Sequence, residues 1–167
     1  MRLGRPTPLR ALVALLASLV LLTLAAMTCG TARAQSEPPE DLAQFPHTTV
    51  EITSGKQVSR FEVWVADTPQ RDQQGLMFVR DLPAGRGMLF PQSPARSMSM
   101  WMKNTYIALD MVFIDGNGRI SHIVEQAEPL SLTTIDSGGP VSAVLEIRGG
   151  EAARRGLKVG DRVTWKH

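Results

Sequence analysis

A short polar segment interrupts the most apolar part of the sequence. Lys103-Asn104-Thr105 brings an ammonium, an amide and a hydroxyl together, just after Trp101 and shortly before a single carboxylate, Asp110. Trp101 offers an aromatic wall, Lys103 a cation and Asn104 a two-sided hydrogen-bonding amide, which suits a small polar or anionic ligand. The sequence therefore predicts a ligand-binding site built from Trp101, Lys103, Asn104, Thr105 and Asp110.

The same residues also have a purely structural interpretation. Asp110 would then either pair with Lys103 or accept hydrogen bonds from backbone donors at the end of a sheet, while Asn104 and Thr105 form a turn. Buried polar groups must be satisfied whatever their purpose, so residue types alone leave both interpretations open.

A catalytic interpretation is the alternative from a different functional class. It makes the protein a small hydrolase or transferase that uses Asp110 with Lys103, and His122 and Glu146 are further candidates for hydrolytic chemistry. The sequence contains no nucleophile elbow around a serine, no His-Glu-x-x-His and no paired-acid motif. We therefore predict a non-enzymatic binding module that uses no cofactor.

Methionines recur at every second residue before the polar segment. Met98, Met100 and Met102 share one face of an extended chain, and Met88 and Met111 lie nearby in sequence. Their thioethers could bind Cu(I) in an exported protein, but methionine also fills irregular cores. Because this block lies between two apolar strands, we predict core packing and no metal site, with Cu(I) binding as an alternative.

The N-terminal residues have the features of a secretory signal peptide. Arginines precede an apolar run over residues 11–27, and Ala32-Arg33-Ala34 offers a cleavage site. We expect residues 1–34 to be removed by cleavage near Ala34, and the mature protein to be periplasmic or extracellular. The alternative is an uncleaved signal that anchors the protein, which would be its only contact with the membrane.

Charge and cysteine content narrow the choice of partners. Four of the 18 basic residues and none of the 16 acidic residues lie in residues 1–34, so the mature chain has a net charge near −2. This charge gives no support for nucleic acid as a partner. The single cysteine, Cys29, also lies in the signal, which leaves no disulfide framework and no thiolate nucleophile. We expect a monomer whose partner is a small molecule or a component of the cell envelope.

The mature chain is long enough for one domain and one core. We predict a flexible tether over residues 35–46, because this stretch is polar and contains prolines, and a single domain over residues 47–167. Short strands are predicted at 48–53, 58–66, 87–90, 98–103, 108–114, 119–126, 141–147 and 162–166. Short helices are predicted from Asp67, as the N-cap, to about Gly75, and at 151–155. Residues 91–96, with two prolines, are predicted to form an irregular segment at the rim of a pocket.

This pattern of about seven strands and two short helices has no βαβ rhythm. It predicts a mainly β fold, an antiparallel β-sandwich or small barrel with peripheral helices. The predicted core consists of Val63, Leu76, Leu89, Met100 or Trp101, Met111, Phe113, Ile120, Val144 and Leu145.

The order of several short motifs resembles that of a known family. The motifs are Gly75-Leu76-Met77-Phe78, Gly87-Met88-Leu89-Phe90, Met100-Trp101-Met102-Lys103-Asn104-Thr105, Leu109-Asp110-Met111, Phe113-Ile114-Asp115, Val144-Leu145-Glu146 before Gly149-Gly150, and residues 156–161. This arrangement resembles the domain of unknown function 192 family (DUF192), small and often exported bacterial and archaeal proteins, over about residues 48–166. One departure is Ala108, where the family usually has proline. The resemblance implies a compact, mainly β fold and brings no established reaction, cofactor or ligand.

Overall fold

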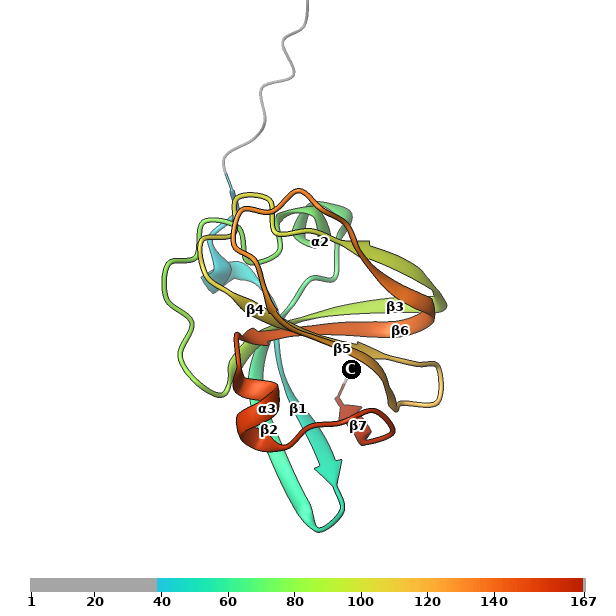
Figure 1. Cartoon of the computed structure of the whole chain (residues 1–167). Helices are drawn as coiled ribbons and strands as arrows, with labels where there is room; N and C mark the ends of the chain where they lie inside the picture. Colours follow the sequence, from blue (N-terminus) through green and yellow to red (C-terminus); the bar gives the residue numbers. More distant parts are fainter. Residues whose placement is uncertain (1–38, 167) are drawn as a thin grey trace, which may run out of the picture. The chain divides into compact units, whose positions relative to one another are not determined.

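The structure is a computed structural model that describes residues 39–166 (Figure 1). Seven strands, two α-helices and one 3-10 helix make up this part of the chain. In chain order they are η1 (Leu42–Gln44), β1 (His47–Ser54), β2 (Gln57–Val65), α2 (Pro69–Gln74), β3 (Arg86–Met100), β4 (Leu109–Ile114), β5 (Ile120–Ala127), β6 (Ile135–Arg148), α3 (Glu151–Arg155) and β7 (Arg162–Trp165). The predicted signal peptide lies outside the described residues.

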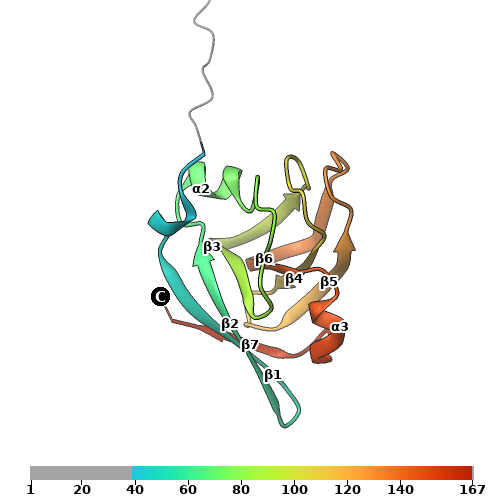
Figure 2. The ribbon, with the colours of Figure 1, turned by 90° about the vertical axis from the view of Figure 1, so that its left-hand side faces the viewer.

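All seven strands belong to one sheet, in the order β5-β4-β6-β3-β2-β1-β7. Neighbouring strands are antiparallel except β2 and β3, which run parallel. A bridge between Arg119 and Arg162 brings the start of β5 close to β7, so the sheet curls into a half-barrel. Figure 2 shows this curvature, with α2 at one end of the domain and α3 with β7 towards the other.

The mainly β prediction is confirmed, but two of its details are not. The sheet is mixed rather than purely antiparallel, because the chain between β2 and β3 crosses over through α2 and returns in the same direction. A two-sheet sandwich is not observed, since a single curved sheet contains every strand of the described residues.

Two strands are much longer than predicted. β3 continues through residues 91–96, which were predicted to be irregular, and its pairing with β6 shifts register between Pro91 and Arg96. Such a shift tolerates residues without a backbone donor, so the prolines do not end the strand. The strand predicted to reach residue 103 ends at Met100, and β6 begins at Ile135 instead of residue 141.

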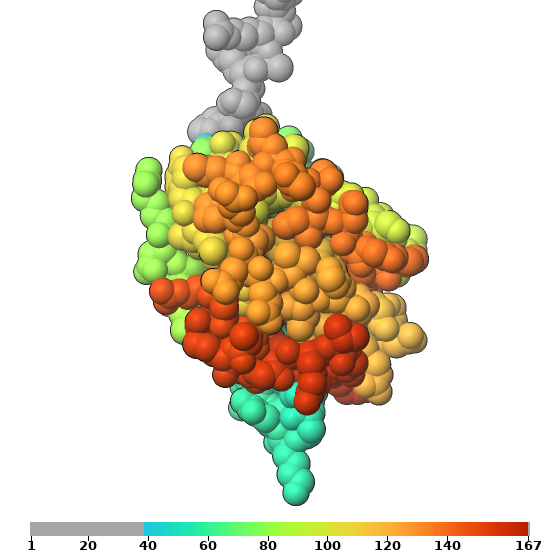
Figure 3. All heavy atoms as spheres, in the orientation of Figure 1, coloured from blue at the N-terminus to red at the C-terminus, as the bar shows by residue number. Residues whose placement is uncertain are grey.

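The curved sheet is buried on both faces, and each face has its own apolar cluster. Val112, Leu145 and Ile147 belong to one cluster, whereas Met111, Phe113 and Val144 belong to the other. Every residue of the predicted core is buried. Where the prediction gave Met100 or Trp101, the buried residue is Met100, and Trp101 is exposed. In Figure 3 the segment around residues 128–140, in orange, covers the upper part of the face shown, and the β1–β2 hairpin projects below.

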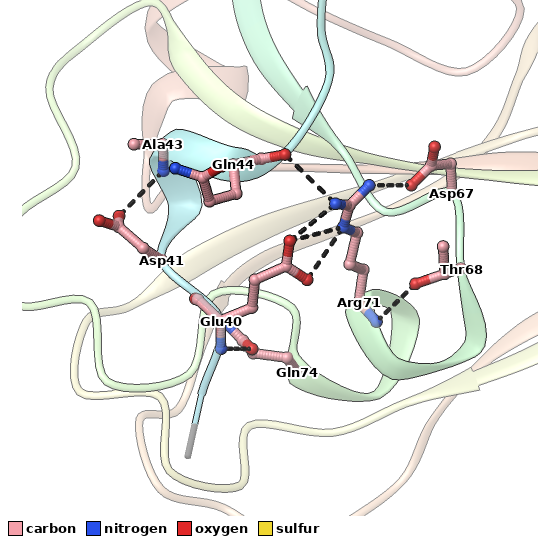
Figure 4. Close-up of polar contacts among 8 residues, drawn as sticks. All are labelled: Glu40, Asp41, Ala43, Gln44, Asp67, Thr68, Arg71 and Gln74. Carbon is pink, nitrogen blue, oxygen red and sulfur yellow. Dashed lines mark hydrogen bonds and ion pairs between the residues drawn. The ribbon is translucent and has the colours of Figure 1, made fainter. Parts of the chain in front are cut away.

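Residues 39–46, part of the predicted tether, pack against α2 (Figure 4). The Arg71 guanidinium lies 2.7 Å from carboxylate oxygens of both Glu40 and Asp67, and its hydrogen bonds lower the pKa of Glu40. Thr68, not the predicted Asp67, caps α2, because its hydroxyl accepts a hydrogen bond from the backbone N–H of Arg71. These contacts fix the position of α2, which forms one side of the cavity described below.

Candidate functional site

A cavity of about 260 Å³ opens beside α2 and reaches the central strands of the sheet. It is lined by Asp72, Gln73, Gln74, Gly75, Leu76, Met77, Phe90, Met98, Ser99, Met100, Trp101, Lys103, Thr105 and Glu146. Its walls therefore come from α2 and the turn after it, from β3, from the segment after β3, and from β6. Gly75 allows the chain to leave α2 beside the cavity, because it has a positive φ of 50° and a Cβ there would lie 3.3 Å from the Phe90 ring.

Glu146 places a carboxyl group in the middle of this sheet. It lies on β6 between Met88 of β3 and Met111 of β4, and only 4% of it is exposed. Its carboxyl group makes no hydrogen bond within residues 39–166. Burial raises the pKa of Glu146 to about 8, and the charge of Asp72 contributes to this shift. At neutral pH this side chain is therefore mostly a neutral carboxylic acid.

Asp72 contributes a second carboxyl group from α2. Its Oδ1 atom is buried and has no hydrogen-bond partner among the described residues. Burial raises the pKa of Asp72, and the nearby charge of Arg96 partly offsets this effect. Two carboxyl groups thus line one cavity without the partners that buried acids usually have.

The segment between β3 and β4 contributes three of the five predicted site residues to the cavity: Trp101, Lys103 and Thr105. The Lys103 ammonium lies 5.2 Å from the centroid of the Trp101 ring, and 41% of Trp101 is exposed. The predicted turn is present, because the backbone N–H of Thr105 donates to the Met102 carbonyl at 3.1 Å. Trp101 and Lys103 therefore occupy the mouth, while Thr105 is buried.

Asn104 does not line the cavity but belongs to the strained loops around it. Asn104, Phe78 and Leu130 all have positive φ, which is unusual for residues other than glycine. The Phe78 N–H donates to the Asn104 carbonyl at 2.8 Å, and the Leu130 N–H donates to the Thr105 carbonyl at 3.1 Å. Three touching loops thus hold strained residues beside the cavity, an arrangement that is common at functional sites.

Asp110 lies elsewhere. It is fully buried and accepts hydrogen bonds of 2.8 Å from the backbone N–H groups of Gln126, Gly150 and Ala152. It does not line the cavity, and within residues 39–166 it forms no ion pair with Lys103. Asp110 therefore caps the start of α3 and joins it to the sheet, as the structural interpretation describes.

The methionines divide into two groups. Met98 and Met100 line the cavity together with Met77, whereas Met88, Met102 and Met111 are fully buried and do not line it. In the part of the chain that the structure describes, no three His, Cys, Asp or Glu side chains gather in a way that could hold a metal ion.

The sequence interpretation included one cavity carboxyl among its catalytic candidates and missed the other. Glu146 had a signal, since it is a single carboxylate in the apolar stretch Val144-Leu145-Glu146-Ile147. Asp72 had none, because it lies in a short helix made almost entirely of polar residues. His122, the other candidate, is exposed and stacks on Phe113, with ring centroids 5.6 Å apart.

Among residues 39–166, no helix is both long enough and apolar enough to cross a membrane.

Solved structures that are similar to this chain include the following two. A protein from Sinorhizobium meliloti 1021, described as a "putative transcription regulator", is 38% identical, with a TM-score of 0.70 over 72% of this chain and 95% of that one. A protein of unknown function from Novosphingobium aromaticivorans DSM 12444 is 35% identical, with a TM-score of 0.73 over 77% of this chain and 91% of that one.

No curated protein matches the sequence significantly. The family model DUF192, described as "Uncharacterized ACR, COG1430", matches residues 50–165. This match covers the whole sheet from β1 to β7 apart from a few residues at its start and includes all the residues that line the cavity. The chain therefore belongs to the DUF192 family.

Proposed function

We propose that this protein is a non-enzymatic binding module that is exported and holds a small polar ligand in the cavity between α2 and β6. The main support is the pair of carboxyl groups on the cavity wall: Asp72, whose buried Oδ1 atom has no hydrogen-bond partner among the described residues, and Glu146, which is only 4% exposed. Burying such a group costs on the order of 1–3 kcal/mol and brings no benefit to folding. A ligand that hydrogen-bonds to Glu146 would account for its presence.

The cavity wall also indicates what such a ligand carries. Two carboxyl groups favour a ligand with hydrogen-bond donors or positive charge and disfavour one that carries only negative charge. Leu76, Phe90 and Met100 offer apolar surface beside them, which suits an organic molecule better than a bare ion. The ligand is thus a small molecule with both a polar end and an apolar body.

The two alternatives have less support. The enzymatic alternative needs Asp110 to reach a substrate, but Asp110 is fully buried and both of its carboxylate oxygens accept hydrogen bonds from backbone N–H groups. The Cu(I) alternative needs Met98, Met100 and Met102 to face one site, but Met102 is fully buried and does not line the cavity. Because Met77, Met98 and Met100 could still bind a soft metal, the test below also looks for the mass of bound copper.

Replacing Lys103 with Ala should weaken ligand retention without unfolding the protein. Lys103 is exposed and makes no ion pair within residues 39–166, so its loss should change the free energy of unfolding by less than about 1 kcal/mol. Native mass spectrometry of protein from its own producing cells should show an organic adduct on the wild type and less of it on Lys103→Ala. Lys56→Ala, in the β1–β2 turn, is the matched control.

Three results would contradict this proposal. The wild type could have the mass of the bare chain, the adduct could persist equally on Lys103→Ala and Lys56→Ala, or the extra mass could be that of copper. The last result would favour the Cu(I) alternative. A large loss of stability in Lys103→Ala would instead give this lysine a structural role.

A further inference from the structure

The cavity contains two acidic groups and one basic group that do not pair with one another. Asp72 and Glu146 place carboxyl groups along its wall, and Lys103 places an ammonium at its mouth. Among residues 39–166, Lys103 pairs with neither carboxyl group, and its ammonium lies over the Trp101 ring instead. Two carboxyl groups and an ammonium kept apart within one small cavity complement a ligand that carries both charges.

The remaining surface of the cavity is suited to a hydrocarbon group. Leu76, Phe90, Met98 and Met100 line it and are nearly fully buried. Methionine side chains are flexible and adapt to apolar groups of different shape. With a volume of about 260 Å³, the cavity has room for a small molecule only.

We propose that the cavity is a receptor for a free amino acid with an apolar side chain, bound as its zwitterion. The ammonium group of the ligand lies against Asp72 and Glu146, its carboxylate against Lys103, and its side chain against Met98 and Met100. This inference rests on the proposed binding function and names the class of ligand.

The arriving ammonium also changes the protonation of the carboxyl pair. Burial raises the pKa of Glu146 to about 8, with the Asp72 charge adding to the effect, so the cavity holds a proton at neutral pH. Arg96 acts on Asp72, and Lys103 faces the same cavity from the segment after β3. Binding of an ammonium releases this proton to solvent and leaves an ion pair in its place.

Calorimetric titration with three matched probes tests the inference. The three probes share one hydrocarbon body and differ in charge. L-phenylalanine carries both charges, phenethylamine only the positive charge, and 3-phenylpropanoate only the negative charge. L-phenylalanine should bind at least about tenfold more tightly than either probe with a single charge. L-leucine and L-methionine extend the test to side chains of other shapes.

Two variants should show which protein group binds the ammonium of the ligand and which binds its carboxylate. Glu146→Gln should weaken binding of L-phenylalanine and phenethylamine and leave 3-phenylpropanoate unchanged. Lys103→Ala should weaken binding of L-phenylalanine and 3-phenylpropanoate and leave phenethylamine unchanged. Glu125→Gln and Lys56→Ala alter exposed groups outside the cavity and should change none of the three affinities.

Failure of this inference can be told apart from failure of the proposed function. A single-charge probe that binds as tightly as L-phenylalanine, or variants that weaken all three probes equally, would overturn the zwitterion while leaving a binding cavity. Failure of all three amino acids to bind at about 10 mM would also overturn it. An organic adduct in the native mass spectrum would then still support the proposed function, and a bare chain would contradict both.

Discussion

Replacing Glu146 with Gln is expected to stabilise the protein at alkaline pH and to leave its stability nearly unchanged at acid pH. In the unfolded chain this carboxyl group has its ordinary pKa of 4.5, whereas burial raises the pKa to about 8 in the folded protein. The folded state therefore holds the proton more tightly, and stability falls as pH rises from 4.5 through 8. The loss attributable to Glu146 is on the order of 4 kcal/mol.

Gln keeps the shape of the protonated acid but cannot ionise. Thermal unfolding of Glu146→Gln should match the wild type near about pH 5 and exceed it by about 10 °C near about pH 9. Glu125→Gln, an exposed residue on β5, should follow the wild type at both pH values. A constant difference between Glu146→Gln and wild type across this pH range would show that Glu146 is already ionised in the folded protein.

Replacing Asp110 is expected to cause the largest loss of stability. Its Oδ1 accepts hydrogen bonds from Gln126 and Gly150, and its Oδ2 accepts one from Ala152. Asp110→Asn places an amide donor against one of these donors, which should cost about 2 kcal/mol or more. Asp110→Ala leaves three backbone donors without their acceptor and should cost more than about 3 kcal/mol.

Denaturant unfolding of both variants measures these losses, with exposed Asp81→Asn as the control that should stay within about 0.5 kcal/mol of wild type. Asp110→Asn and Lys103→Ala should therefore behave differently, one losing stability and the other losing ligand. Equal large losses would make the whole segment a structural clamp and would remove Lys103 from the proposed site. A stable Asp110→Ala would show that α3 does not depend on this cap.

The alternation of apolar residues was enough to predict most of the strands and a set of core positions that are all buried, although the core of the described residues is larger and includes Phe45 of the predicted tether. Val63, Phe113 and Leu145 follow patterns that only a buried strand explains, and all three are fully buried. The parallel pairing of β2 with β3 could not be predicted, because local patterns do not specify which strands become neighbours. The continuation of β3 through two prolines was missed because its register shift depends on β6, a partner distant in sequence.

The sequence predicted only part of the site, again because contacts between segments distant in sequence decide which residues line the cavity. Trp101, Lys103 and Thr105 line the cavity because their short segment follows directly on β3. Asp110 and Glu146 give the same signal, a lone carboxylate in an apolar strand, but only their surroundings distinguish a cap from a cavity residue. Asp72 could not be found at all, since its importance comes from where Arg71 and Glu40 hold α2.

The central claim is that an amino acid with an apolar side chain occupies the cavity between α2 and β6, and methyl NMR of the methionines tests it most directly. Met77, Met98 and Met100 line the cavity, whereas Met88, Met102 and Met111 are packed in the core, so the protein contains its own controls. On titration with L-phenylalanine, the methyl signals of the first three should shift together and saturate, while those of the other three stay nearly unchanged. Saturable shifts confined to the core methionines, or no shift at the three cavity methionines, would contradict an amino acid as the occupant of this cavity.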